Sequence, residues 1–244
     1  NSGAQQEMLE MAEKIDAVIG CSFMGLSAVP SDHPRFLGMQ GMHGHYASSM
    51  AMHNADCIIA LGARFNDRVT GNRERFSTRA KIVHLDIDGA ELSKNIKPAH
   101  GMRGDIKLTL QKLINLLDEK RRPQWQNMTA QLRNDEQYSM DHRPGLTPRS
   151  ALLTLNEFTK GVLPVATDVG QHQMWSAQTL AFKEQRRFIS SGGLGTMGFG
   201  MGAASGAQLA TGKRTVLVTG DGSFGMCLNE LATAVHERLP LVIL

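Results

Sequence analysis

The stretch Thr215-Val216-Leu217-Val218-Thr219-Gly220-Asp221-Gly222-Ser223-Phe224 decides the fold. Its first five residues are apolar or β-branched and predict a buried strand, and the glycine-rich turn after them predicts the start of a helix. A strand, a glycine loop and a helix in this order are typical of parallel α/β sheets, in which ligands bind beyond the carboxyl ends of the strands. The helix expected after the loop has four apolar residues on one face: Leu228, Leu231, Ala232 and Val235.

The loop itself suggests a phosphate and a metal ion. Its glycines allow backbone N–H groups to approach phosphate oxygens. Asp221 is placed to hold Mg²⁺ against a diphosphate, because this ion prefers one or two carboxylate oxygens together with phosphate and water. A Gly-Asp-Gly sequence also forms an ordinary turn. The stretch alone leaves both interpretations open.

Short β-branched runs alternate with helical patterns along the whole chain. Besides residues 215–219, strands are expected at residues 17–21, 57–61, 81–87, 162–167, 187–190 and from 241 onward. Apolar residues at helical spacing predict helices around 8–15 and 108–117. This alternation predicts an α/β protein with mainly parallel sheets covered by helices on both faces, in two three-layer domains.

The range 121–148 interrupts the alternation, because it is polar, contains three prolines and has one weak helical segment around 125–132. We expect it to be a linker between a first domain, 1–120, and a second domain, 149–244. The chain opens directly before a helical pattern and stops inside an apolar run. Both domains are therefore expected to be truncated, the first at its start and the second at its end.

Composition excludes several classes of protein. Lys and Arg number 26 against 23 Asp and Glu, and the basic residues are scattered, so no nucleic-acid partner is expected. Cys21, Cys57 and Cys227 lack metal-ligand or CxxC spacing, which argues against zinc and disulfides and favours a reduced, cytoplasmic location. No apolar run approaches the roughly 20 residues of a membrane span, and no signal peptide is recognisable, so no membrane partner is expected.

Two further glycine loops follow expected strands. Residues 193–198 read G-x-G-x-x-G, which also fits an NAD-dependent dehydrogenase. Two features oppose that alternative: the interval to Asp221 exceeds the usual ~20 residues, and Asp221 lies in a glycine loop of its own. Residues 168–175 form the third loop, which carries His172. Three successive strand ends would present these loops to one crevice, which favours a cofactor contact over an ordinary turn.

These loops resemble one enzyme family. GDGSF at 220–224 resembles the start of the thiamine-diphosphate signature, and DVGQHQMW (168–175) and SGGLGTMGFG (191–200) resemble the catalytic large subunit of acetohydroxyacid (acetolactate) synthases. The resemblance implies a thiamine-diphosphate domain in which Asp221 binds Mg²⁺ and Met197 wedges under the bent cofactor as a catalytic residue. The residues implied to contact this cofactor are Gly170, Gln171, His172, Gly195, Met197, Gly220, Asp221, Gly222 and Ser223.

The same resemblance extends to GMQGMHG (38–44) and GARFNDRVTG (62–71), which imply a Rossmann-like FAD domain. It also implies two catalytic residues there: Arg68, which would bind the carboxylate of the second substrate, and Met42 beside it. Two plainer interpretations stay open, namely that Asp86 and Asp88 only cap a helix and that Met42 only fills a core. The residues implied to contact FAD are Ser22, Phe23, Met24, Gly41, Met42, His43, Gly62, Ala63, Arg64, Asn66, Arg68, Val69, Asp86, Ile87, Asp105 and Ile106.

The activity implied by the resemblance is acetolactate synthesis for branched-chain amino acids. Pyruvate loses CO₂, and the two-carbon unit is joined to pyruvate or 2-ketobutyrate. The implied partners are a second copy of the chain, or a higher homo-oligomer, and a small regulatory subunit. Alternatives are glyoxylate carboligase, the FAD-free catabolic acetolactate synthase, a dehydrogenase, or a non-enzymatic FAD-binding or regulatory module.

The chain departs from the family pattern at three points. Asn66 replaces the first Asp of RFDDRVTG. Met201-Gly202 replaces a Leu-Pro pair, and the exchange of a rigid proline for a flexible glycine destabilises the helix by roughly 1 kcal/mol. The family's pyrimidine-binding domain with its catalytic Glu, the second metal ligand and the C-terminal substrate loop are also missing from the sequence. The chain alone is therefore expected to be inactive.

Overall fold

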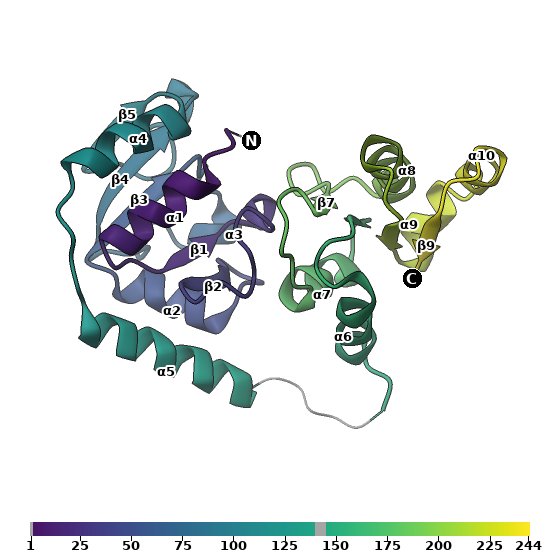
Figure 1. Ribbon diagram of the computed structural model, residues 1–244, viewed down its shortest axis with the longest axis horizontal. Coiled ribbons are helices and arrows are strands. Elements are labelled where there is room, and N and C mark those ends of the chain that lie inside the picture. Colours follow the sequence, from purple (N-terminus) through teal and green to yellow (C-terminus); the bar gives the residue numbers. More distant parts are fainter. Residues whose placement is uncertain (1, 140–144) are drawn as a thin grey trace. The chain divides into compact units, whose positions relative to one another are not determined.

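The computed structural model describes residues 2–139 and 145–244. Its contacts divide the chain into two units: the first comprises residues 1–22 and 35–140, and the second comprises 23–34 and 141–244. Every strand pair in both units is parallel (Figure 1). The predicted α/β class with parallel sheets is confirmed.

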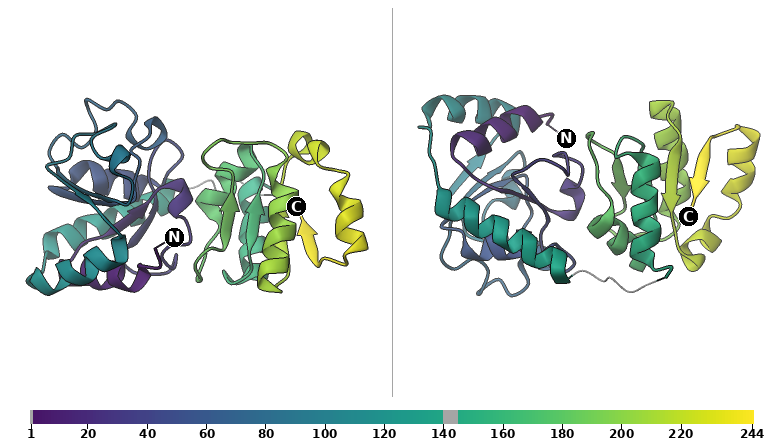
Figure 2. Two further views of the ribbon diagram at one scale, coloured as in Figure 1. Left: turned by 90° about the horizontal axis from the view of Figure 1, so that it is seen from above. Right: turned by 60° about the horizontal axis from the view of Figure 1, so that its bottom comes forward.

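The first unit contains a two-stranded sheet, β1-β2, and a three-stranded sheet in the order β3-β4-β5. Its chain is coloured from purple to teal in Figure 2. The helices α1 and α4 correspond to the two amphipathic segments predicted from the sequence. The elements of this unit are α1 (Gln5–Lys14), β1 (Ile19–Cys21), β2 (Phe36–Met39), α2 (Tyr46–Asn54), β3 (Cys57–Leu61), α3 (Asp67–Thr70), β4 (Lys81–Asp86), the 3₁₀ turn η2 (Gly89–Glu91), β5 (His100–Arg103), α4 (Ile106–Leu116) and α5 (Pro123–Ser139).

Alternation along β3 divides the core of the first unit into two clusters. Ile59 and Leu61 pack against α1 and α4, where Leu110 is completely buried. Ala60, between them, faces the opposite cluster with Phe65 and Ile82. This period of two is what a strand covered on both faces requires.

The range predicted as a linker contains a long helix, α5, which groups with the first unit. Its start is tied to the buried Asp16, which accepts hydrogen bonds from Arg122 N–H and from Gln126 Nε2 at 3.0 Å. Further along, Glu136 Oε1 accepts the N–H of Tyr46 at the start of α2 at 2.7 Å. Much of 121–148 is thus packed structure rather than free linker, while its residues 140–144 lie outside the described part of the chain.

The second unit is one four-stranded parallel sheet in the order β7-β6-β8-β9. Its elements are the 3₁₀ turn η1 (Phe23–Gly25), α6 (Pro148–Thr159), β6 (Val165–Thr167), α7 (Gln171–Thr179), β7 (Phe188–Ser190), α8 (Phe199–Thr211), β8 (Thr215–Val218), α9 (Asp221–Met226), α10 (Glu230–His236) and β9 (Leu241–Ile243). Thr147 begins α6 with a capping box, in which its hydroxyl and that of Ser150 exchange hydrogen bonds with backbone N–H groups.

The sheet of the second unit is buried on both faces, which confirms the three-layer prediction. Val216 and Val218 pack with Leu152 and Leu155 of α6 on one face. Leu217, between them, packs with Met201 of α8 on the other face. Because the strand is covered on both sides, its sequence is a continuous apolar run rather than an alternating one.

The helix predicted after Asp221 is wrong in one respect. The structure has two short helices, α9 and α10, with a break around Cys227. Of the four residues expected on one apolar face, Leu228 and Val235 are exposed, whereas Leu231 packs against the core. The spacing of the apolar residues did not reveal the break, because Leu228 lies within the break and still fits the helical spacing.

A segment from early in the chain completes the second unit. We call Phe23–Pro34 the strap. Ser27 Oγ accepts the N–H groups of Arg187 and Phe188 at 3.1 and 3.3 Å, and the Phe23 ring packs edge-on against that of Phe188 at 5.3 Å. The strap thus covers β7, the edge strand that would otherwise present unpaired backbone groups.

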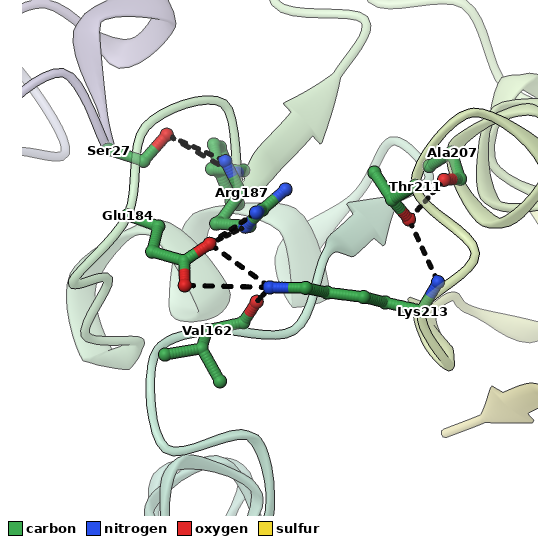
Figure 3. A network of polar contacts seen from close by, with 8 residues as sticks. Ser27, Val162, Glu184, Arg187, Ala207, Thr211 and Lys213 are labelled. Carbon is green, nitrogen blue, oxygen red and sulfur yellow. Dashed lines mark hydrogen bonds and ion pairs between the residues drawn. The ribbon is translucent and has the colours of Figure 1, made fainter.

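An ion-pair network joins the amino ends of three strands (Figure 3). Glu184 Oε2 accepts from Arg187 Nε at 2.9 Å and from Lys213 Nζ at 3.2 Å. Lys213 Nζ also donates to the carbonyl of Val162 at 3.5 Å. Val162, Arg187 and Lys213 precede β6, β7 and β8, so the network fixes the edge of the sheet opposite to its glycine loops.

Candidate functional site

Three glycine-bearing loops leave the carboxyl ends of β6, β7 and β8, which are neighbours in the sheet. They are the three loops that the sequence predicted to share one crevice. In an open parallel sheet this edge is where ligands bind. The side chains described below hold the loops to one another.

Asp168, at the end of β6, clamps the second loop. Its side chain is completely buried. Oδ1 accepts the N–H groups of Val169 and Gly198, both at 2.9 Å, and Oδ2 accepts that of Gly200 at 3.0 Å. A buried carboxylate needs such donors, because burial without partners is costly. Asp168 therefore sets the position of the loop before α8 and the start of that helix.

His172 joins the first loop to the third. A Cβ added to Gly170 would lie 2.9 Å from His172 Cε1, and one added to Gly220 would lie 3.1 Å from His172 Nδ1. The imidazole thus packs against the backbone of two glycines. Any other residue at either position would force the ring to shift. Burial lowers the pKa of His172, against the opposing attraction of Asp168. The ring is therefore expected to be neutral at pH 7.

Ser223 and Met197 complete the contacts among the loops. Ser223 Oγ donates to the carbonyl of Val169 at 2.9 Å, which ties the start of α9 to the first loop. A Cβ on Gly222 would meet Met197 Cε at 3.4 Å, so the third loop passes beside this side chain. Met197 remains 42% exposed and is available to a ligand.

The residues present fit a diphosphate with one protein carboxylate on its metal. Asp221 is exposed and begins the first turn of α9, where helical N–H groups have no partners within the helix. Gly220 and Gly222 leave no side chain between that backbone and solvent. Among the described residues, no three His, Cys, Asp or Glu side chains gather as a metal centre. A metal here would complete its coordination with phosphate and water.

The remaining residues predicted for thiamine diphosphate lie on the same loops. Gln171 is the first residue of α7 and is exposed. Gly195 has φ +65° and lies on the exposed part of the second loop. A Cβ added to it would lie 3.9 Å from Val169 Cγ1. All nine predicted residues are therefore brought to one edge of one sheet.

A second group of loops lies in the first unit. Gly41 has φ +102°, and an added Cβ would lie 2.3 Å from the carbonyl oxygen of Arg68. The N–H of Met42 donates to that same oxygen at 2.8 Å. Arg68 Nη1 lies 3.9 Å from Met42 Sδ. The two predicted catalytic residues of this unit, Met42 and Arg68, are therefore in contact.

Asn66 and Asp105 act as helix caps. Asn66 Oδ1 accepts the N–H of Val69 at 3.2 Å and begins α3. Asp105 Oδ1 accepts the N–H of Leu108 at 2.9 Å and begins α4. A Cβ on Gly62 would lie 3.3 Å from Ile106 Cδ1, so the loop after β3 meets the start of α4. An Asp would serve as N-cap equally well at position 66.

Asp86 and Asp88 both hold the turn that follows β4. Asp86 ends β4 and is buried, with Oδ1 accepting the N–H of Asp88 at 2.9 Å. Asp88 caps the η2 turn through the N–H of Ala90. Asp86 Oδ2 lies 3.7 Å from Nε2 of the completely buried His84. Capping is therefore carried mainly by Asp88, and Asp86 holds the turn behind it.

The other residues predicted for FAD fall into two sets. Phe23 and Met24 belong to the strap and group with the second unit, where both would contact a side chain added at Gly192. This differs from their expected place in the domain 1–120. The rest belong to the first unit and are exposed or half-buried at loop ends: Ser22, His43, Ala63, Arg64, Val69 and Ile87.

Residues that the predicted set omits hold the second-unit loops together. Asp168 is one, and Ser190 is another: its hydroxyl accepts Thr167 Oγ1 at 2.7 Å and Gln173 Nε2 at 2.8 Å. The sequence signal that could have identified both residues is a polar side chain at the end of an otherwise apolar strand. In the first unit, burial raises the thiol pKa of Cys21 to about 12, so this thiol stays protonated at neutral pH.

Comparisons with known proteins give consistent matches. Residues 1–113 match the family described as thiamine pyrophosphate enzyme, central domain, and 168–244 match its C-terminal TPP binding domain. The chain is 40% identical to the acetolactate synthase isozyme 3 large subunit of Escherichia coli (strain K12), over 99% of this chain and 44% of that protein. It is 45% identical to the isozyme 2 large subunit of the same organism, over 91% and 40%.

A plant relative gives the same result. Acetolactate synthase 1, chloroplastic, of Oryza sativa subsp. japonica is 41% identical over 100% of this chain and 39% of that protein. The chain thus spans less than half the length of the curated relatives it matches. Within residues 2–139 and 145–244, no helix is long and apolar enough to cross a membrane.

Proposed function

The chain belongs to the thiamine pyrophosphate enzymes, and we propose that it serves acetolactate synthesis as part of a large catalytic subunit. The reaction joins the two-carbon unit left by decarboxylation of pyruvate to a second 2-ketoacid, pyruvate or 2-ketobutyrate. The observation that carries the proposal is the set of three glycine loops fixed to one another by Asp168, His172 and Ser223. The identity to large subunits over the whole chain supports it.

When bound, thiamine diphosphate would supply a nucleophilic carbon for the keto carbon of a 2-ketoacid and a cationic ring that takes up the electron pair released as CO₂ leaves. In the proposal, the first-turn N–H groups of α9 and the loop glycines bind its diphosphate. Asp221 provides one carboxylate oxygen to Mg²⁺. Met197, beside Gly222, supports the body of the cofactor, and the neutral His172 keeps the first and third loops at a fixed distance.

FAD is proposed for the first unit. Two features support it: glycine loops in tight backbone contact at Gly41 and Arg68, and a buried carboxylate, Asp86, at the end of β4. An acidic residue at such a strand end can accept ribose hydroxyls. Arg64 is exposed at the loop after β3 and can bind phosphate.

Arg68 is the proposed contact for the carboxylate of the second substrate. Its guanidinium is exposed and near the thioether of Met42. A guanidinium binds a carboxylate bidentately and so fixes its orientation, which brings the keto carbon of the acceptor to a defined place. Met42 offers an apolar surface beside it. We also propose that the chain forms a homo-oligomer in the cytoplasm and binds a small regulatory subunit. The relatives are named as large subunits, which supports the regulatory subunit.

The test uses the full-length parent protein. Acetolactate is expected from pyruvate only when thiamine diphosphate and Mg²⁺ are present, and Asp221→Asn is expected to raise the Mg²⁺ concentration needed for half-maximal activity. Asp118→Asn, an exposed change in the first unit, is the matched control. No acetolactate with all cofactors present would overturn the proposal. Turnover of glyoxylate alone would instead support a related carboligase.

A further inference from the structure

His84 is a completely buried histidine in β4, the central strand of the three-stranded sheet in the first unit. Neither ring nitrogen has a hydrogen-bond partner among the described residues. A buried donor or acceptor without a partner is destabilising, so its presence in a folded protein needs an explanation. The residues assigned to the cofactors so far give this imidazole no role.

The neighbours of His84 within the sheet are small and apolar. In the register of the strands, it lies between Ala60 of β3 and Gly101 of β5, which leave room for the ring. The ring of Phe65 packs edge-on against the imidazole, with 5.1 Å between the two centroids. Apolar contacts therefore hold the imidazole in place and leave its hydrogen-bonding capacity unused.

The carboxylate of Asp86 lies within reach of this ring. The two residues are two positions apart in β4, so their side chains lie on the same face of the sheet. Nε2 of His84 is 3.7 Å from Oδ2 of Asp86, which is too long for a hydrogen bond, and a shift of less than ~1 Å would close it. Oδ1 already accepts the N–H of Asp88. No other hydrogen bond to Oδ2 is formed by the described residues.

A ligand that covers Asp86 would make such a bond more favourable. The side chain of Asp86 is 9% exposed, so its carboxylate still has contact with solvent. A ribose on this carboxylate, as proposed for FAD, would displace the remaining water, and a carboxylate without donors is costly to bury. Hydrogen bonds to a charged acceptor are also stronger than those between neutral groups. His84 can supply the missing donor from the buried side of Asp86.

We propose that His84 is a positioning residue for the adenosine end of FAD, which donates its Nε2 hydrogen to Oδ2 of Asp86 when the ribose hydroxyls cover that carboxylate. The inference rests on the proposed function, of which FAD in the first unit is a part. It adds a residue that stabilises the bound cofactor without touching it. The unpartnered Nε2 thereby becomes a contribution to FAD affinity.

The first test measures FAD binding to the flavin-stripped, full-length parent protein by the change in flavin fluorescence. His84→Phe keeps an aromatic ring and removes both nitrogens. It is expected to weaken FAD binding by roughly tenfold, while the urea midpoint measured without FAD stays equal or rises, because two unpartnered polar atoms are gone. His84→Gln keeps a donor near the position of Nε2 and is expected to restore most of the affinity. A purely structural role would instead lower stability and FAD affinity together in His84→Phe.

His100→Phe is the matched control. His100 is exposed and pairs in register with Val83, so it lies on the face of the sheet opposite to His84. Its FAD affinity is expected to equal that of the unchanged parent. Equal FAD binding by His84→Phe and the unchanged parent would overturn the inference, and so would a loss that His84→Gln shares in full.

The second test asks whether His84 acts through Asp86. In a parent that already carries Asp86→Ala, the further change His84→Phe is expected to leave FAD affinity unchanged, because the acceptor is gone. A further loss of roughly tenfold would show that His84 acts elsewhere and would overturn the inference.

The outcomes also separate the inference from the proposed function. If the parent makes no acetolactate but binds FAD more weakly after His84→Phe, only the proposed function fails. If acetolactate forms and His84→Phe binds FAD as the unchanged parent does, the inference fails alone. If the parent binds no FAD, the inference fails together with the proposed FAD site.

Discussion

The carboxylate of Asp168 accepts the backbone N–H of Gly198 at 2.9 Å, and this bond joins the end of β6 to the loop that follows β7. Asp168 is completely buried and also holds Gly200, so two oxygens satisfy three donors. The loop that carries Met197 is thereby fixed from beneath.

Replacing Asp168 by Ala is expected to destabilise the second unit by about 2–4 kcal/mol, because buried N–H groups lose their acceptor. Asp168→Asn keeps one acceptor oxygen and is expected to cost less. Urea unfolding of the chain measures both. The exposed Asp221→Ala is the control and is expected to change stability by less than about 0.5 kcal/mol. A similar loss in the control would contradict the role of Asp168.

Gly41→Ala is expected to destabilise the first unit by more than Gly71→Ala. Both glycines have positive φ, at +102° and +57°, so both substitutions strain the backbone. Only at Gly41 would the new Cβ collide with backbone, 2.3 Å from Arg68 O, while nothing lies within 4 Å at Gly71. We expect a difference of at least about 1 kcal/mol in urea unfolding and, in the parent, a lower FAD content for Gly41→Ala only. Equal losses of stability in the two variants would show that backbone strain, and not the collision of the new Cβ, sets the cost.

Acid is expected to weaken the network around Glu184. Hydrogen bonds from Arg187 and then Lys213 lower the Glu184 pKa. The folded-state pKa therefore lies below the unfolded one, so the stabilisation is present above about pH 4.3 and is lost as pH falls through the folded pKa. Glu184→Gln should be less stable than the unchanged chain near pH 7, with the gap closing as the pH falls below the folded-state pKa of Glu184. The exposed Glu157→Gln is the control, and a gap that persists in acid would contradict the network.

His172 is expected to titrate below its pH midpoint in the urea-unfolded chain. Burial against Gly170 and Gly220 lowers its pKa, and Asp168 only partly compensates. Because the unfolded state binds the proton more readily, stability falls as pH drops below the unfolded pKa. NMR of the imidazole in native and urea-unfolded samples measures both midpoints. A native midpoint at or above the unfolded one would rule out the packed neutral ring.

All seven strands predicted from the sequence are present, but two strands escaped prediction. β2 contains Gly38 and follows Pro34, which are loop signals, although all four of its residues are buried. β5 is an edge strand with a polar, mostly exposed sequence, His100–Arg103. Neither has the β-branched run that marked the others, because their pairing comes from neighbours rather than from local preference.

α5 was underestimated for a similar reason. Its sequence is polar, so no apolar face predicts its position. It is held by hydrogen bonds to residues distant in sequence, such as that from Arg133 to the carbonyl of Phe36 at 2.7 Å. Such contacts exist only once the first unit has folded.

The candidate site divides in the same way. Residues on glycine motifs, such as Gly220 and Asp221, could be found because loop geometry restricts the sequence locally. The clamp by Asp168 and the packing of His172 against two glycines depend on side chains that meet across three loops. Each of these residues belongs to a sequence motif, but a local pattern does not tell which side chains come into contact across different loops.

The strap also sets an order of events during synthesis. Ser27 lies 160 residues before its partner Arg187. At about 5–20 residues per second, the ribosome releases the strap roughly 10 to 30 s before β7 exists. During that interval Phe23 and its neighbours have no edge strand to cover and are exposed to chaperones. Folding of the second unit must therefore recruit a stretch of chain that emerged long before it.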